Sequence, residues 1–299
     1  MKQRFLAIVN PAAGGGRSAK LADSILDLVR QVGVELEVAR TTAAGDATAL
    51  ARRAYGDGFR NFLAVGGDGT AFEIVNGLFP QALSGDRVSL GFLPLGTGNS
   101  FLKDFTSSGV QYTINALENR SRRSCDLIRL HHADGDLHFL NLLSLGLPAE
   151  VGALTNRRFK PLGELGYVLG VLARVVNLQH FAFPHRINGG EWDARPCLFL
   201  SFSNSKFTGG KMMIAPHADP TDGQIECVRW GPIGRAALIR TLPQLFTGSH
   251  IRHPLASRAA ARRVDFDLGA TVNVLIDGEV LQLDCRWLEV LPAALDAVV

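Results

Sequence analysis

Long apolar runs are missing from this 299-residue sequence. The longest apolar stretch, residues 167–183, is interrupted by Arg174 and His180, which makes it an unconvincing membrane span. The apolar run near the N-terminus ends at Asn10 and Pro11. That run is too short for the core of a signal peptide and is typical of a first buried strand. We therefore expect a cytoplasmic protein whose membrane contact, if any, is peripheral, at the inner membrane face.

Cysteine and net charge are also sparse. The 4 cysteines include no CxxC pair, which argues against a zinc site or a disulfide framework and fits a reducing compartment. The formal net charge is only +3, so we expect no nucleic-acid partner. No HExxH spacing and no GxSxG elbow occur, which leaves a histidine-bound metal or a hydrolase triad without support.

What the sequence does contain is ordinary globular composition, with 46% hydrophobic and 20% charged residues. Its length suggests two compact domains. In the first part, strand patterns alternate with helix patterns, and Ser18 is the predicted N-cap of the first helix. The predicted strands are residues 5–9, 34–38, 61–65 and 88–93, and the predicted helices cover 21–29, a segment from 46, and 71–78. This alternation favours an α/β domain with a mostly parallel sheet.

After about residue 126 the pattern changes to strands that follow one another with few helices between them. The predicted strands are residues 127–130, 137–143, 197–203, 225–230, 264–268 and 271–276, and the predicted helices are 162–178 and 235–246. Such a succession favours a mainly antiparallel β domain. We place the first domain at residues 1–126 and the second at residues 127–285.

Three glycine-rich turns each follow a predicted strand of the first domain. They read NPAAGGGR at residues 10–17, GGDGT at 66–70 and PLGTGNS at 94–100. Glycines at strand ends let backbone amides approach phosphate oxygens closely, although each turn alone is also readable as a plain tight turn. None matches GxxxxGK[ST] or GxGxxG. In the second turn, Asp68 lies between glycines, and this pattern indicates that its carboxylate lies beside phosphates and Mg²⁺.

Taken in order, the segments NPAAGGGR, TTAAGDA, GGDGTAFEIVNG, PLGTGNSF and IDGE resemble the diacylglycerol kinase catalytic-domain family, which includes sphingosine kinases and bacterial lipid kinases. The resemblance covers nearly the whole chain. It implies a first domain of NAD-kinase and diacylglycerol-kinase type, to which a C-terminal segment, about residues 286–299, returns. The implied activity is transfer of the γ-phosphoryl group of ATP to a lipid hydroxyl, with diacylglycerol as the foremost acceptor.

The resemblance also implies roles for particular residues. Asp277 matches the general base toward the lipid hydroxyl, and Glu279 is its companion; Asp277-Gly278 is in addition predicted to be a hairpin turn. The residues expected to bind ATP are Asn10, Thr41, Gly66, Gly67, Asp68, Gly69, Thr70, Glu73, Gly96, Thr97 and Asn99.

A separate metal site is implied at residues 219–224. Asp222 would supply a carboxylate, with Asp219 and Gln224 giving mainly backbone oxygens, to Mg²⁺ or Ca²⁺. An Asp-Gly turn before a strand is an equally good interpretation. The catalytic Mg²⁺ is expected to arrive with ATP, and Asp68 is the best candidate for its protein ligand.

Three residues depart from the family pattern, and two other functions stay open. Ala13, Phe72 and Ser100 stand where the family usually has serine, asparagine and aspartate. These departures are the support for a nucleotide-binding regulator without catalysis, whereas GGDGT alone also fits an NAD-kinase-like or other small-molecule kinase. The basic clusters Arg157, Arg158, Lys160 and Arg258, Arg262, Arg263 are expected on solvated faces, with contact to anionic lipid headgroups as the lesser hypothesis. A homodimer stays open.

Overall fold

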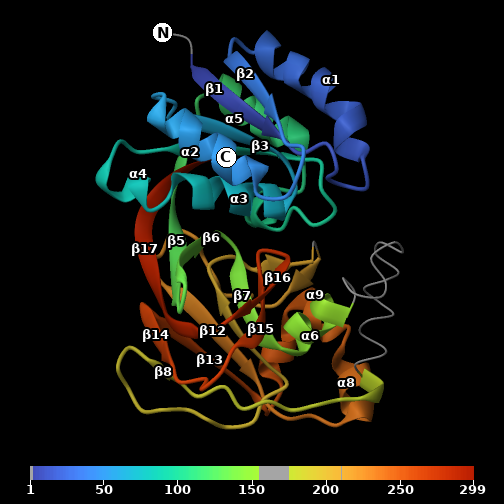
Figure 1. Ribbon diagram of the computed structural model, residues 1–299. Coiled ribbons are helices and arrows are strands. Elements are labelled where there is room, and N and C mark those ends of the chain that lie inside the picture. Colours follow the sequence, from blue (N-terminus) through green and yellow to red (C-terminus); the bar gives the residue numbers. More distant parts are fainter. Residues whose placement is uncertain (1–2, 155–174, 210) are drawn as a thin grey trace. The chain divides into compact units, whose positions relative to one another are not determined.

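The computed structural model describes residues 3–154, 175–209 and 211–299. It divides into two compact units, one formed by Met1–Leu127 with Leu291–Val299 and the other by Ile128–Val290 (Figure 1). We call them unit 1 and unit 2. Most of the predicted helix at residues 162–178 and the basic cluster at 157–160 lie outside the described residues.

Unit 1 is built on a parallel sheet with strand order β2-β1-β3-β4-β17. Its strands are β1 (Arg4–Val9), β2 (Glu35–Arg40), β3 (Asn61–Gly66), β4 (Ser89–Pro94) and the end of β17 (Cys285–Val298). β1, β3 and β4 are buried over nearly their whole length, as expected for strands covered on both faces. This confirms the predicted α/β class.

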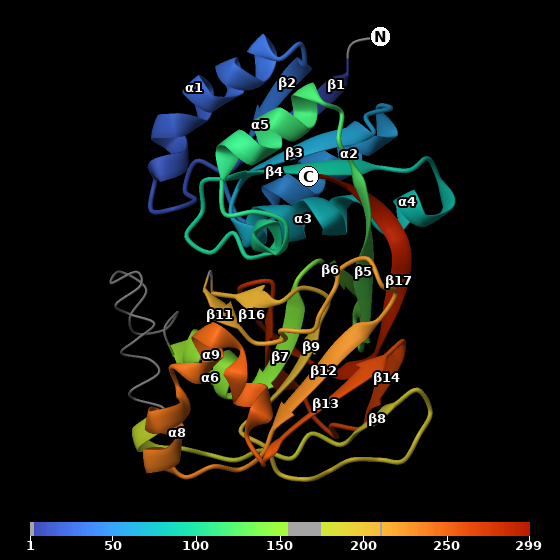
Figure 2. The same ribbon diagram turned by 180° about the vertical axis from the view of Figure 1, so that it is seen from behind.

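Helices cover both faces of this sheet. They are α1 (Arg17–Gln31), α2 (Asp46–Gly56), α3 (Asp68–Leu78), the short α4 (Gln81–Ser84) and η1 (Phe101–Asp104), and α5 (Val110–Glu118). α1 and α5 lie together on one face, and α2 and α3 lie together on the other (Figures 1 and 2). α1 turns Ala22, Leu26 and Val29 toward the core at helical spacing, where they pack with Phe5 and Leu63.

Two helix starts differ from prediction. Helix α1 begins at Arg17, after Gly16 in the left-handed conformation with φ 87°, so Ser18 lies inside the first turn and is not the N-cap. The run of positive-φ glycines leads directly into the helix and leaves no place for a capping side chain. Helix α3 begins at Asp68 rather than at residue 71, because the GGDGT residues themselves form its first turn.

Unit 2 contains a sheet of order β13-β12-β9-β7-β15-β16 in which each strand is antiparallel to its neighbours. Its strands are β7 (Leu142–Gly146), β9 (Phe199–Ser203), β12 (Ile225–Trp230), β13 (Ala256–Ala261), β15 (Val272–Ile276) and β16 (Glu279–Leu283). Among the residues of this unit that the structure describes, the helical segments include α6 (Leu147–Leu154), α8 (Arg235–Thr241), α9 (Gln244–Thr247) and η4 (Ser249–Arg252). The predicted antiparallel domain is thus confirmed.

A second group of paired strands packs on this sheet. It contains β5 (Arg123–His132), β6 (Gly135–Phe139), β8 (His185–Ile187), β14 (Arg263–Phe266) and the first part of β17, while β10 (Phe207–Thr208) and β11 (Met212–Met213) form a separate hairpin. The ring of Phe202 on β9 meets the ring of Phe266 on β14 with centroids 5.2 Å apart. This edge-to-face contact marks a core between two β layers.

Several element boundaries in unit 2 differ from prediction for local reasons. Residues 137–143 were predicted as one strand but form β6 and β7, separated by Leu140 and Asn141. The predicted helix 235–246 is divided into α8 and α9 at Pro243, which cannot continue a helix. β13 was not predicted, because ASRAAA has no apolar alternation.

The cysteines of the chain are buried and unpaired. Burial raises the pKa of the Cys125 thiol to about 12 and that of Cys197 to about 11. Both therefore stay protonated and weakly reactive at neutral pH. Among the described residues, no helix has the length and apolarity needed to cross a bilayer.

Candidate functional site

The predicted nucleotide-binding residues of unit 1 lie where parallel strands end. The register pairs Val9 with Arg40 and with Val65, and Gly66 with Pro94, so four strands finish at the same edge of the sheet. Asn10, Thr41, Gly67 and Leu95 are the residues that follow these four ends. The carboxyl edge of a parallel sheet is where ligands bind in α/β folds.

Backbone hydrogen bonds join the loops at this edge. The Asn10 amide donates to the Val65 carbonyl at 3.0 Å, and the Thr41 amide donates to the Val9 carbonyl at 2.9 Å. The Leu95 and Gly96 amides both donate to the Gly66 carbonyl, at 2.9 and 2.8 Å. The loops are therefore one connected structure and not separate turns.

Glycine is required where these loops touch. A Cβ atom on Gly96 would lie 2.4 Å from the Cα of Gly67, and a Cβ on Gly14 would lie 2.3 Å from the Leu95 carbonyl oxygen. Both distances are shorter than real Cβ contacts, so a side chain at either place would push one loop away from the next. The glycines of the three motifs thus allow the motifs to pack against one another.

The GGDGT motif places the end of β3 directly before helix α3. Gly67 is the N-cap without a side-chain cap, and Asp68, Gly69 and Thr70 form the first turn. Amides in the first turn of a helix have no intrahelical partner, and together with the helix dipole they favour an anion. The Thr70 hydroxyl accepts a hydrogen bond from Asn10 Nδ2 at 3.4 Å, which joins the first and second motifs.

Asp68 connects the second motif to the third. Its Oδ1 accepts a hydrogen bond from the Ser100 amide at 2.7 Å. An aspartate at position 100 would bring a second carboxylate close to this one, so the departure at Ser100 lowers the negative charge beside Asp68. The contact gives Asp68 a structural role, because it joins the second motif to the third.

Asn99 closes the third motif. It adopts a positive φ of 52°, and its Nδ2 donates to the Gly96 carbonyl at 2.8 Å. Its Oδ1 is buried without a hydrogen-bond partner among the described residues. Asn99 lines a hollow in unit 1 together with Gly66, Gly67, Asp68, Pro94 and Phe101. Because a buried acceptor without a donor is costly, this small hollow is suited to a donor the size of a water molecule.

Thr97 is exposed on the same motif, whereas Glu73 is committed to the neighbouring loop. Glu73 extends from α3 to the start of α2, where its two oxygens accept the amides of Gly45 and Ala47 at 3.0 and 3.1 Å. The structure thus brings Glu73 to the loop that carries Thr41. There the Glu73 carboxylate caps the N-terminus of α2.

Asp46 fixes the rest of this loop. Its Oδ2 accepts the Thr42 hydroxyl at 2.6 Å and the amides of Thr42 and Ala43 at 2.7 and 2.9 Å. The hydroxyl of Thr42, followed by these two amides, lowers the pKa of Asp46 below its usual value. Two carboxylates, Asp46 and Glu73, therefore hold residues 42–47 in place.

Replacing Glu73 by alanine is expected to lower the free energy of unfolding by about 1 kcal/mol, because two helix-start amides lose their acceptor. We also expect weaker binding of an ATP analogue, since the loop that carries Thr41 is released. Glu73→Gln keeps one acceptor oxygen, so its losses of unfolding free energy and of analogue affinity should be smaller. Urea denaturation and analogue titration measure both effects, with exposed Glu118→Ala as the control. A Glu73→Ala variant as stable as Glu118→Ala would contradict the capping role.

In unit 2, Asp277 occupies the hairpin turn predicted for it. Ile276 pairs with Glu279, and Asp277 and Gly278 both have positive φ, 46° and 91°, as a type I′ turn requires. The Asp277 side chain is only 3% exposed. Its Oδ2 accepts the Leu140 amide at 2.9 Å, and its Oδ1 accepts the Asn141 and Leu142 amides at 2.9 and 3.1 Å.

These three hydrogen bonds explain why β6 and β7 are separate strands. The amides of residues 140–142 turn toward Asp277 and so are unavailable to a continuous strand ladder. Glu279 directly follows the turn and its side chain is exposed. The two acids of the IDGE motif therefore have opposite environments, one buried and bonded to backbone amides, the other open to solvent.

The predicted metal site at residues 219–224 is an exposed turn. Asp219 Oδ1 accepts the Thr221 amide at 3.0 Å and its hydroxyl at 2.7 Å, while Asp222 Oδ1 accepts the Gln224 amide at 2.9 Å. Within residues 3–154, 175–209 and 211–299, no group of three or more His, Cys, Asp or Glu side chains is placed to hold a metal ion. Metal binding through backbone oxygens here stays a prediction.

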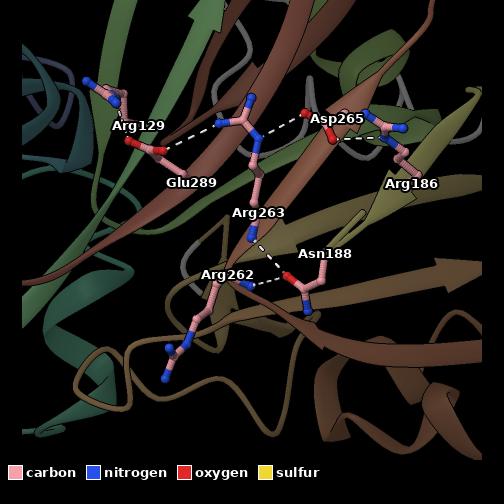
Figure 3. Close-up of polar contacts among 7 residues, drawn as sticks. All are labelled: Arg129, Arg186, Asn188, Arg262, Arg263, Asp265 and Glu289. Carbon is pink, nitrogen blue, oxygen red and sulfur yellow. Dashed lines mark hydrogen bonds and ion pairs between the residues drawn. The ribbon is translucent and has the colours of Figure 1, made fainter. Parts of the chain in front are cut away.

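Two of the three arginines in the predicted basic cluster, Arg258 and Arg263, pair with acids, and Figure 3 shows the surroundings of Arg263. Arg263 Nε lies 3.0 Å from Asp265 Oδ1, and its Nη1 lies 3.6 Å from Glu289 Oε2. On either side, Arg186 pairs with Asp265 and Arg129 with Glu289, so charges of opposite sign alternate across the strands. Arg258 forms a bidentate ion pair with Glu226, in which its Nε and Nη2 donate to the two carboxylate oxygens. Arg262 is exposed, and contact of the cluster with anionic headgroups stays a prediction.

Three buried polar residues at the Asp277 turn were missed from sequence. Asn141, Asn204 and Ser205 are buried beside the segment that Asp277 binds. Asn204 and Ser205 follow a predicted strand, where they look like ordinary turn residues, and Asn141 lies inside the predicted strand 137–143, so no sequence signal distinguishes these residues.

Comparison with known proteins agrees with this geometry. The family described as "Diacylglycerol kinase catalytic domain" matches residues 4–130, and "YegS C-terminal NAD kinase beta sandwich-like domain" matches residues 141–299. A Mycobacterium tuberculosis (strain H37Rv) protein named diacylglycerol kinase is 26% identical over 298 residues, which cover 99% of this chain and 94% of that protein.

A Chromohalobacter salexigens protein named "Probable lipid kinase YegS-like" is 36% identical over 216 residues, which cover 71% of this chain and 67% of that protein. The crystal structure of a diacylglycerol kinase from Bacillus anthracis str. Sterne has the same fold, with a TM-score of 0.72 at 19% identity, over 99% of this chain and 96% of that one. The chain therefore belongs to the diacylglycerol kinase catalytic-domain family.

Proposed function

We propose that this protein is an ATP-dependent lipid kinase and that diacylglycerol is its acceptor. The observation that carries the proposal is the edge of unit 1, where three glycine-rich motifs interlock at the ends of β1, β3 and β4 around the N-terminus of α3. Backbone amides and glycines without side chains suit a triphosphate. The family relatives named diacylglycerol kinase support the lipid acceptor.

The residues present fit ATP with Mg²⁺. Bound ATP supplies the phosphoryl group, and Mg²⁺ on its phosphates offsets their negative charge. The amides of Gly67 and Gly69 would bind phosphate oxygens, and the Asp68 carboxylate, held by the Ser100 amide, would serve as a ligand of Mg²⁺.

We assign the proton acceptor to Glu279 rather than to Asp277. The resemblance gives the base to Asp277, but its side chain is 3% exposed and both its oxygens accept backbone amides. Glu279 is exposed and can reach an acceptor hydroxyl. Asp277 then has the task of fixing the turn on which Glu279 stands.

The first experiment is transfer of labelled γ-phosphate from ATP·Mg²⁺ to a panel of lipids in mixed micelles. The panel contains diacylglycerol, sphingosine, ceramide and phosphatidylglycerol, and NAD is included as a soluble acceptor. We expect label in diacylglycerol above all others. Label in NAD alone would replace the proposal by an NAD-kinase activity. ATP binding without any labelled acceptor would favour a regulator without catalysis.

A further inference from the structure

The backbone of residues 140–142 is hydrogen-bonded from two opposite sides within unit 2. On one side, Asp277 accepts the three amides through its carboxylate and donates its own amide to the Leu142 carbonyl at 3.2 Å. On the other side, the Leu140 carbonyl accepts Asn204 Nδ2 at 2.8 Å. The Asn141 carbonyl accepts the amides of Asn204 and Ser205 at 2.7 and 3.1 Å. Every backbone donor and acceptor of the segment thus has a partner.

The order of the strands makes this arrangement inevitable. β7 lies between β9 and β15 and is antiparallel to both. The ends of β9 and β15 therefore flank the beginning of β7, with Ser203 opposite Leu142 and Ile276 opposite Leu143. Asn204 is the first residue after β9, and Asp277 is the first residue after β15. Residues 140–142 lie between them.

The polar side chains at this place are completely enclosed. Asn204 and Ser205 are 0% exposed, and Asn141 is 3% exposed. The Ser205 hydroxyl donates to Asn141 Oδ1 at 2.9 Å. Burying an amide or a hydroxyl is costly unless it is hydrogen-bonded, and even then the net gain is small. The distinctive result of this cluster is a rigid segment 140–142, on which the orientation of the Asp277 carboxylate depends.

We propose that Asn204 and Ser205 are positioning residues for the turn that carries Asp277 and Glu279. They hold residues 140–142, those residues hold Asp277, and Asp277 fixes the turn that presents Glu279. The inference rests on the proposed function, because the position of Glu279 matters to turnover only if it accepts the hydroxyl proton. Displacing a catalytic group by about 1 Å can lower the rate by about 10²-fold.

The test compares Asn204→Ala with a matched control on the same strand. Ser203 is also 0% exposed, and its hydroxyl pairs with that of Ser201 at 2.9 Å and not with residues 140–142. We expect Asn204→Ala to lower kcat by about 10-fold, with KM for ATP and for lipid unchanged. Ser203→Ala should keep kcat within about twofold. If Asn204→Ala does not fold, Ser205→Ala removes a single side-chain hydrogen bond and should lower kcat by about threefold.

Two further readouts separate positioning from a general loss of structure. In the double variant Asn204→Ala/Asp277→Asn, the fold reduction of kcat should be smaller than the product of the two single reductions, because both residues act through one segment. Amide hydrogen exchange at residues 277–279 should be faster in Asn204→Ala than in Ser203→Ala. Hydrogen exchange is measured without substrate, so this readout does not depend on lipid kinase activity. If the wild-type protein labels no lipid, that result overturns the proposed function but leaves the exchange comparison valid. Independent effects on kcat, or equal exchange in the two variants, would overturn the positioning role.

Discussion

Replacing Glu279 by glutamine is expected to lower lipid phosphorylation by about 10²- to 10⁴-fold, the usual contribution of a general base. Glutamine keeps the shape of the side chain and removes its capacity to accept a proton. Because Glu279 is exposed, the free energy of unfolding should change by no more than about 0.5 kcal/mol. Turnover of ATP·Mg²⁺ with diacylglycerol and urea denaturation measure the two quantities.

Asp277→Asn is the matched comparison two residues away. Asparagine tolerates the positive φ of the turn, but its Nδ2 is a donor that faces a backbone amide which now has no acceptor. We expect a loss of about 1–3 kcal/mol in the free energy of unfolding, with a smaller loss of turnover than in Glu279→Gln. The reverse pattern, an inactive but fully stable Asp277→Asn beside an active Glu279→Gln, would return the base to Asp277.

The second large effect is expected at Gly14, and the chain provides its own control. Gly14 and Gly15 have nearly equal positive φ, 62° and 64°, so alanine is strained to the same extent at both, by about 1 kcal/mol. Only at Gly14 would the new Cβ collide with a neighbour, the Leu95 carbonyl oxygen at 2.3 Å. Gly14→Ala should therefore separate the first glycine motif from the third.

For Gly14→Ala we expect a total loss of about 3 kcal/mol in the free energy of unfolding and at least about tenfold weaker binding of an ATP analogue. For Gly15→Ala we expect a loss of about 1 kcal/mol in the free energy of unfolding and an unchanged affinity for the ATP analogue. Chemical denaturation and titration with the analogue give both values. Equal affinities in the two variants would show that contact between the motifs is irrelevant to the nucleotide.

Prediction from sequence succeeded where local pattern and tertiary structure agree. The apolar runs at residues 5–9 and 61–65 are strands because parallel strands are buried on both faces, and this places the glycine motifs at strand ends. The hairpin at Asp277-Gly278 followed from turn chemistry alone. The family and the fold class were predicted correctly for the same reason.

Prediction failed where a distant side chain decides the backbone. Residues 137–143 have the pattern of one strand, but Asp277, more than a hundred residues later, binds the amides of residues 140–142 and divides it. The C-terminal return was expected only as a segment of about residues 286–299, whereas the structure forms one strand, β17, from Cys285 to Val298. There the Ala293 amide, at a positive φ of 49°, donates to Asp126, a contact that no local pattern reveals.

The length of β17 has a consequence for the order in which the chain can fold during synthesis. The fifth strand of the unit 1 sheet, with Asp296 opposite Ser89, follows all of unit 2 in the sequence. A nascent chain that already contains all three glycine motifs still lacks the strand beside β4, and that edge of β4 has no permanent partner until β17 has been made. Unit 2, Ile128–Val290, emerges completely before that moment. Unit 1 therefore begins before unit 2 but can be completed only after it, and until then the open edge of β4 is a place where the chain can pair wrongly.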